Sequence, residues 1–233
     1  LYFLPLHRQS DIGADGHAKR GGFLPPVPLP RRMWAGSQFQ FHAPLCIGDT
    51  VTRTSTIHDV TEKHGRTGPL VFVKVRHELR RAGEDAIALT EFHDIVYREL
   101  ARPDDIAPPP KPSHPNPLWR TRWTPDDVLL FRYSALTFNG HRIHYDADYC
   151  RQVEGYSAQV IHGPLNATLM AGLAASCAVS LGRSLRDFAY RGLAPALLGD
   201  TMRYAAWPQD DSICVEARLA SGALCMRGEA KMA

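Results

Sequence analysis

The sequence predicts an α+β fold in which antiparallel strands wrap a buried helix, and three observations predict it. Residues 164–181 have near-helical apolar spacing with many small residues. Three strand-like segments follow this helix, at 188–198, 201–207 and 213–227, and the last one turns back at Ser221-Gly222. The first half of the chain contains successive strand-like segments and no obvious helix.

The first half is predicted to form an antiparallel meander. Its strand-like segments are separated by glycine-containing turns and lie at 39–41, 51–60, 70–79 and 86–97. Before them, the proline-rich stretch from Gly21 to Pro30 should be extended and irregular. Such a stretch can pack over a binding site or form a plain surface loop, and both interpretations stay open.

The second half opens with a predicted helix that runs to about Thr137. Thr124 is a plausible N-cap, and Pro125 suits the first helical position. Asp126 and Asp127 would lie at the positive end of the helix dipole. The longer helix at 164–181 has small residues at nearly every other position, which predicts burial on most of its sides.

One buried helix followed by antiparallel strands that can wrap it is the layering of a hot-dog fold. We expect a double hot dog, in which a sheet wraps a central helix twice. Residues 1–100 would form an N-terminal hot-dog-like domain that is truncated at its start, with its helix encoded upstream. Residues 101–117 hold seven prolines and are predicted to be a linker. Residues 118–233 would form the C-terminal catalytic domain.

The composition excludes several classes of protein. A hydrophobic content of 44% and a charged content of 22% are typical of a folded globular chain. A net charge of +3 does not indicate nucleic-acid binding. The five cysteines form no C-x-x-C pair, which argues against a zinc site or a disulfide framework and favours a reducing compartment. No apolar run has the length of a membrane span, so we expect a cytoplasmic protein without metal, nucleic acid or membrane partners.

Polar groups that can handle a proton or a water are concentrated between Ser134 and Asp146, with Gly140 among them. Soon afterwards, residues 160–165 place a glycine and a proline at a predicted helix start, where backbone N–H groups lack helical acceptors. A neutral imidazole can take a proton from water, and helix N–H groups can stabilise an enolate-like oxygen. These parts indicate addition or loss of water beside a carbonyl, but weakly, because the chain has 11 histidines.

These motifs support a resemblance that covers nearly the whole chain. Residues 131–146, together with 155–156 and 162–165, resemble the hydratase-2 signature of the MaoC-like, hydroxyacyl-thioester dehydratase type 2 family. Residues 21–36 and 65–73 are similar to a branch that includes mesaconyl-CoA and itaconyl-CoA hydratases. The resemblance implies a hydro-lyase that acts on an acyl-CoA and uses no cofactor beyond the CoA of its substrate.

The resemblance also implies roles for particular residues. In the family, an Asp and a His five residues later activate the water. His144 matches that His, but Asn139 stands at the Asp position and cannot act as a general base. We therefore expect His144 to carry the proton and Asn139 to orient water or thioester, unless Asn139 only forms a turn. Pro164 has no N–H, so Gly163 or Leu165 is the expected oxyanion donor.

The remaining candidates are less specific. His162 either lines the site or bridges backbone groups beneath the helix. His141, Arg142, Asp146 and Asp148 are interpreted as loop and cap residues, and Tyr133 as core. Three arginines could bind a free carboxylate on the acyl group, although a solvated surface charge is the ordinary expectation for each: Arg31, Arg32 and Arg66.

The substrate and several alternatives stay open at this stage. A C5 dicarboxylyl-CoA such as mesaconyl-CoA or itaconyl-CoA follows from the branch resemblance. A 3-hydroxyacyl-thioester dehydratase of monocarboxylic chains, a hot-dog thioesterase and a non-catalytic acyl-thioester binding protein are the alternatives. Whether the chain forms a homodimer is also open.

Overall fold

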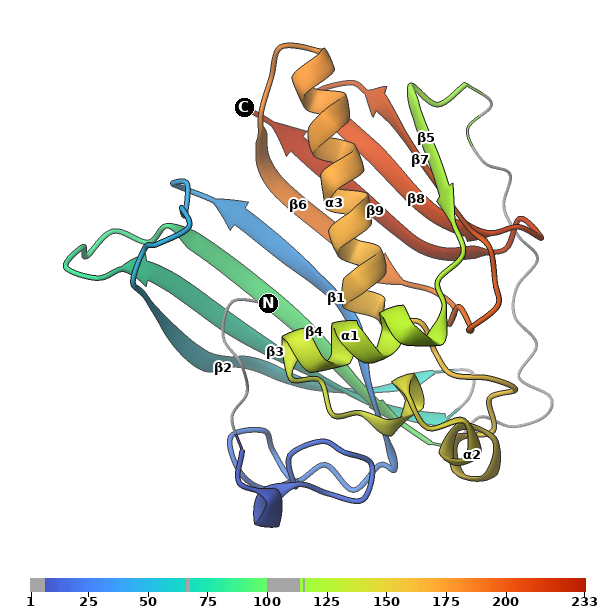
Figure 1. The fold of residues 1–233 in the computed structure, drawn as a ribbon. Coiled ribbons are helices and arrows are strands. Elements are labelled where there is room, and N and C mark those ends of the chain that lie inside the picture. Colours follow the sequence, from blue (N-terminus) through green and yellow to red (C-terminus); the bar gives the residue numbers. More distant parts are fainter. Residues whose placement is uncertain (1–6, 66–67, 100–113, 115) are drawn as a thin grey trace.

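The computed structural model describes residues 7–65, 68–99, 114 and 116–233 (Figure 1). Its first half contains four strands and its second half three α-helices and five strands, counted over these described residues. In chain order the elements are β1 (Arg31–Phe41), β2 (Val51–Gly65), β3 (Gly68–Arg81), β4 (Leu89–Arg98), β5 (Trp119–Trp123), α1 (Asp127–Thr137), α2 (Ala147–Tyr149), α3 (Gly163–Ser180), β6 (Leu185–Gly192), β7 (Met202–Gln209), β8 (Ser212–Leu219) and β9 (Leu224–Met232).

All nine strands belong to one antiparallel sheet, in the order β2-β3-β4-β1-β6-β9-β8-β7-β5. β1 joins the two halves, because Ser37 pairs with His93 of β4 on one side and with Tyr190 of β6 on the other. Residues that face each other across antiparallel strands share one face of the sheet. The inner faces of both halves are therefore continuous, and side chains from β1 can reach the second half.

α3 lies along the strands β6–β9, which curve around it (Figure 1). Met170, Ala174 and Cys177 of α3 are fully buried against this sheet, together with Phe188 and Ile213. A single helix within an antiparallel sheet confirms the predicted α+β hot-dog fold. Most sides of α3 are buried or half-buried, as predicted, and one stripe is exposed: Thr168, Gly172, Ser176 and Val179.

The proline-rich stretch before β1 packs over the sheet of the first half. Val27 and Leu29 are buried and belong to a cluster with Val73, Val75 and Tyr97 of β3 and β4. The guanidinium of Arg20 donates hydrogen bonds to the carbonyls of Val27, Leu29 and Pro30, which fixes the irregular backbone. The stretch is extended and irregular, as predicted, and it covers a sheet face. The linker at 101–117 stays a prediction, since 100–113 and 115 lie outside the described residues. The helix expected upstream of Leu1 also stays a prediction.

Some element boundaries differ from the expectation. The N-cap of α1 is Asp126, whose carboxylate accepts from the N–H of Leu129, whereas Thr124 bonds instead to the hydroxyl of Thr201. The strand predicted at 188–198 ends at Gly192; beyond it, the carbonyl of Ala196 accepts from Ile161 and braces the loop before α3. β5 was not predicted, and β1 begins earlier than expected. No described helix is both long and apolar enough to cross a membrane.

Candidate active site

His144 lies at the end of a short 3-10 turn, next to the start of α3, and is only 6% exposed. Its Nδ1 lies 2.7 Å from the carbonyl oxygen of Val160. Because a carbonyl can only accept, Nδ1 carries the hydrogen and Nε2 keeps a lone pair. Burial lowers the pKa of His144 to about 4 against the opposing hydrogen bond to Val160, so the ring is neutral near pH 7. His144 is therefore a neutral base with one defined basic nitrogen.

His162 lies directly against His144 and caps α3. The two rings stack with centroids 3.7 Å apart and an interplanar angle of 17°. Nε2 of His162 is 2.8 Å from the hydroxyl of Ser134 on α1, so its ring bonds a side chain rather than the backbone. Burial, followed by the neighbouring His144, lowers the pKa of His162. His162 thus provides an uncharged wall that fixes the plane of the His144 ring.

The start of α3 offers the N–H groups that could hold an oxyanion. Gly163 and Leu165 belong to the first turn, where helix geometry provides no intrahelical acceptor for N–H groups. The indole of Trp34, from β1, packs against this turn: a Cβ placed on Gly163 would lie 3.1 Å from Cε3 of Trp34. The structure therefore brings the predicted oxyanion donors beside His144 and His162, with a wall supplied by the first half.

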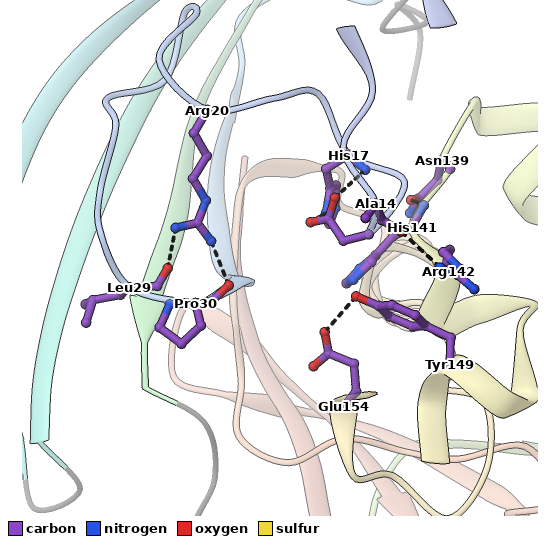
Figure 2. Close-up of polar contacts among 12 residues, drawn as sticks. Ala14, His17, Arg20, Leu29, Pro30, Asn139, His141, Arg142, Tyr149 and Glu154 are labelled. Carbon is purple, nitrogen blue, oxygen red and sulfur yellow. Dashed lines mark hydrogen bonds and ion pairs between the residues drawn. The ribbon is translucent and has the colours of Figure 1, made fainter. Parts of the chain in front are cut away.

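Asn139 lies in the loop after α1 and is half-buried. Its Oδ1 accepts from the backbone N–H of His141 at 3.1 Å, which closes the turn between α1 and His144 (Figure 2). The side-chain oxygen of Asn139 therefore has a local structural partner, and its NH2 group remains as a donor. The proposed orienting role of Asn139 stays a prediction.

The structure adds a group that sequence reasoning missed, from the segment before β1. The ring of His17 packs on that of His141, with centroids 4.0 Å apart (Figure 2). The ring centroid of His141 also lies 5.7 Å from that of His144. Nδ1 of His17 is 3.0 Å from Oδ2 of Asp15. The carbonyl of Asp15 also accepts from the backbone N–H of Arg142. No motif indicated this contact, and His141 was interpreted only as a loop residue.

Charge in this group is concentrated on one carboxylate. Burial raises the pKa of Asp15, but the hydrogen bonds and charge of His17 and the charge of Arg32 outweigh it, so its pKa lies well below the usual range. Burial lowers the pKa of His17 despite the hydrogen bond to Asp15, and burial also lowers that of His141 strongly. Near pH 7 the site therefore holds an ionised Asp15 and uncharged imidazoles.

The three arginine candidates have different surroundings. Arg31 is 8% exposed, lies 3.2 Å from a carboxylate oxygen of Glu154 and covers the ring of Tyr156, so the expectation of a solvated charge was wrong for it. Arg32 is half-buried on β1, and its charge acts on Asp15, His17 and His141. Among the described residues Arg32 forms no ion pair. Arg66 lies outside the described residues.

Comparisons with known proteins relate the chain to one family. A model of the family described as hydroxyacyl-thioester dehydratase type 2 matches residues 1–198. A mesaconyl-C(4)-CoA hydratase of Chloroflexus aurantiacus is 43% identical over 229 residues, which are 97% of this chain and 79% of that protein. The mitochondrial hydroxyacyl-thioester dehydratase type 2 of Schizosaccharomyces pombe is 26% identical over 231 residues, covering 87% of this chain and 74% of that one.

The fold is also found among solved structures. The crystal structure of a MaoC-like dehydratase from Phytophthora capsici matches 92% of this chain and 77% of its own with a TM-score of 0.64. The sequence identity is 15%, so this match speaks for the fold alone. The family match and the identity to the Chloroflexus protein together cover nearly all of the chain. The chain therefore belongs to the hydroxyacyl-thioester dehydratase type 2 family and is a hydro-lyase with the MaoC-like hot-dog fold.

Proposed function

We propose that the chain adds water reversibly to the C2=C3 double bond of a 2-enoyl-CoA thioester whose acyl group carries a free carboxylate. The observation that carries the reaction is the buried His144, whose Nδ1–H is committed to the carbonyl of Val160. Its Nε2 is left to take a proton from water while the water oxygen bonds to C3. Electron density then moves to the thioester oxygen, which the N–H of Gly163 or Leu165 stabilises.

His144 can return the proton to C2, which completes the addition without a change in the protein. The reverse sequence removes water from a 3-hydroxyacyl thioester. In this scheme the histidine acts as a general base and then as a general acid, and a neutral imidazole at pH 7 is the required starting state. The scheme needs no cofactor apart from the CoA of the substrate. A cytoplasmic location and a homodimer stay predictions.

A dicarboxylyl substrate is supported by two observations. The Chloroflexus relative is named a mesaconyl-C(4)-CoA hydratase. Arg31 forms an ion pair with Glu154, whereas Arg32 forms no ion pair among the described residues. Arg32 also lies close enough to the site for its charge to lower the pKa of Asp15 and His141. A guanidinium is the side chain best suited to bind a carboxylate in two-pronged geometry. We assign the free carboxylate of the substrate to Arg32.

The test follows absorbance in the enoyl-thioester band while the full chain meets mesaconyl-CoA or crotonyl-CoA. We expect the wild type to remove the band, His144→Ala to abolish the change, and His64→Ala, at an exposed position of β2, to behave as wild type. Arg32→Gln should raise KM for mesaconyl-CoA about 10- to 100-fold, the loss expected for one charged hydrogen-bonded contact, and affect crotonyl-CoA much less.

Other outcomes would identify other functions. Release of free thiol would show a thioesterase. Thermal stabilisation by either ligand without turnover, retained in His144→Ala, would show a binding protein. A preference of the wild type for crotonyl-CoA, or equal effects of Arg32→Gln on both substrates, would contradict the dicarboxylate assignment while leaving the hydratase intact.

A further inference from the structure

The site contains a carboxylate, although the family's carboxylate position holds Asn139. An amide cannot balance positive charge, and Oδ1 of Asn139 is already bonded to the N–H of His141. Asp15 lies far from this loop in the sequence but contacts it in the fold: its carbonyl accepts from the N–H of Arg142, and its segment packs on Gly140. The inference below rests on the proposed hydratase function and concerns how its base is supported.

A chain of close contacts leads from this carboxylate to the base. Oδ2 of Asp15 lies 3.0 Å from Nδ1 of His17. A nitrogen of His141 and one of His17 lie within 4.8 Å of each other and of an Asp15 carboxylate oxygen. The ring of His141 in turn lies 5.7 Å from that of His144 and is perpendicular to it. Asp15, whose side chain is 39% exposed, is therefore linked to the base through the rings of His17 and His141.

Such a carboxylate has a chemical purpose when His144 takes a proton. The imidazolium forms in a buried place, where low polarity disfavours charge. Of the charged groups that face this region from the packed elements, Arg32 on β1 opposes the new charge, and Glu154 is paired with Arg31. His162 is uncharged. Among the described residues Asp15 forms no ion pair with an Arg or Lys, so its charge remains available to the histidines.

We propose that Asp15 is the counter-charge of the hydration site, a positioning residue that supplies from the N-terminal segment a negative charge that Asn139 cannot provide. It holds His17 as the Nδ1–H tautomer and, through His17 and His141, stabilises the positive charge on His144. The proton passes from water to Nε2 of His144 and then to C2. Asp15 stays ionised and His17 keeps its own proton throughout.

A divalent cation bound by Asp15, His17 and His141 is the competing explanation, because their ligand atoms are close enough. The observations favour the hydrogen-bonded pair. The carboxylate oxygen is already at hydrogen-bonding distance from His17, and the charge of Arg32 acts on all three residues in the direction that repels a cation. The experiment separates the two explanations.

The decisive variant is Asp15→Asn in the full chain, which keeps the shape and can keep the turn but removes the charge. We expect kcat to fall about 10- to 100-fold, within the range of a general acid–base contribution, with KM within about twofold of wild type. The carboxylate raises the pKa of His17 and His141, and by the proposal it also favours the charged form of His144. Its removal should therefore move the acid limb of the pH profile of kcat/KM to lower pH, which a merely structural role would not do.

Rescue provides the sharper test. Asn139→Asp added to Asp15→Asn returns a carboxylate to the site at the family's position, and it should restore at least about tenfold of the lost kcat. Asp11→Asn removes the same charge from an exposed turn of the same segment and should leave kcat unchanged. Wild-type kcat in Asp15→Asn, or a loss with neither rescue nor a shifted acid limb, would overturn the proposal.

Two further measurements keep the outcome unambiguous. About one equivalent of bound divalent metal in the wild type, absent from Asp15→Asn, would overturn the counter-charge in favour of a metal site. If the wild type hydrates no enoyl-CoA, the proposed function fails. NMR titration of the histidine ring protons then still tests the inference, because Asp15→Asn should lower the pKa of His17 and His141, and unchanged titrations would overturn it.

Discussion

At the scale of single residues, the site depends on keeping several imidazoles uncharged. His144 and His162 have their pKa lowered first by burial, and each hydrogen-bonds only a neutral group, the carbonyl of Val160 or the hydroxyl of Ser134. A base of low pKa is weak, but it remains unprotonated at neutral pH, which is the state that can accept a proton from water. The motif in the sequence makes His144 the proposed base, whereas the role of its stacked partner His162 was left open because stacking is a tertiary contact.

The lowered pKa of His162 makes a prediction about stability and pH. Below about pH 6.5 the unfolded chain binds a proton at this histidine, whereas the folded chain does not. The free energy of unfolding is therefore highest above that pH and decreases as the pH falls below it. In His162→Gln the loss of unfolding free energy between pH 7 and pH 5 should shrink by about 2 kcal/mol. Urea denaturation at both pH values measures it. His64→Gln, at an exposed position, is the control, and an unchanged difference in His162→Gln would refute the argument.

At the scale of elements, local sequence predicted which segments are helices and strands better than where each begins. α3 begins within one residue of its predicted start because Pro164 and the helical spacing mark it. α1 begins later than predicted because the side chain of Asp126, not that of Thr124, accepts the capping hydrogen bond from the first turn. The early start of β1 and the existence of β5 depend on pairing with β4 and β7, which a single segment cannot reveal.

The contact between β1 and α3 predicts the effect of one methyl group. Gly163→Ala would place a Cβ 3.1 Å from Cε3 and 3.4 Å from Cζ3 of Trp34, so the helix start or the indole must shift by a few tenths of an ångström. Since oxyanion donors need accurate placement, we expect kcat/KM to fall about tenfold or more while the protein stays folded.

Gly172→Ala is the matched control on the same helix. Its Cβ would meet nothing within 4 Å, so activity should be unchanged and the free energy of unfolding should rise by about 0.5–1 kcal/mol. Steady-state kinetics and thermal unfolding of both variants provide the comparison. Wild-type kcat/KM in Gly163→Ala would move the oxyanion role away from this turn.

At the scale of the whole molecule, the candidate site is assembled from segments that are far apart in the sequence. The motif between Ser134 and Leu165 contains the proposed base and the helix start, and their proximity was predictable because they are near one another in the chain. Asp15 and His17 were not predictable, because their place depends on two backbones that meet at Gly16 and Gly140. A glycine pair of this kind gives no periodic or compositional signal, and only the folded sheet brings the two segments together.

That meeting point allows the docking of the N-terminal segment to be tested separately from its charge. A Cβ on Gly16 would lie 1.8 Å from the carbonyl oxygen of Gly140, and Gly16 has a φ of 86°, which disfavours any side chain. Because backbone cannot yield as a flexible side chain does, Gly16→Ala should displace Asp15 and His17 from the site. We expect kcat to fall at least as far as in Asp15→Asn, and the chain to be cleaved more readily by trypsin after Lys19 and Arg20, while far-ultraviolet circular dichroism is retained.

Gly22→Ala, where a Cβ meets nothing within 4 Å, is the control and should behave as wild type. Wild-type kcat in Gly16→Ala would show that hydration proceeds without the docked segment, so the site would then be complete without Asp15 and His17.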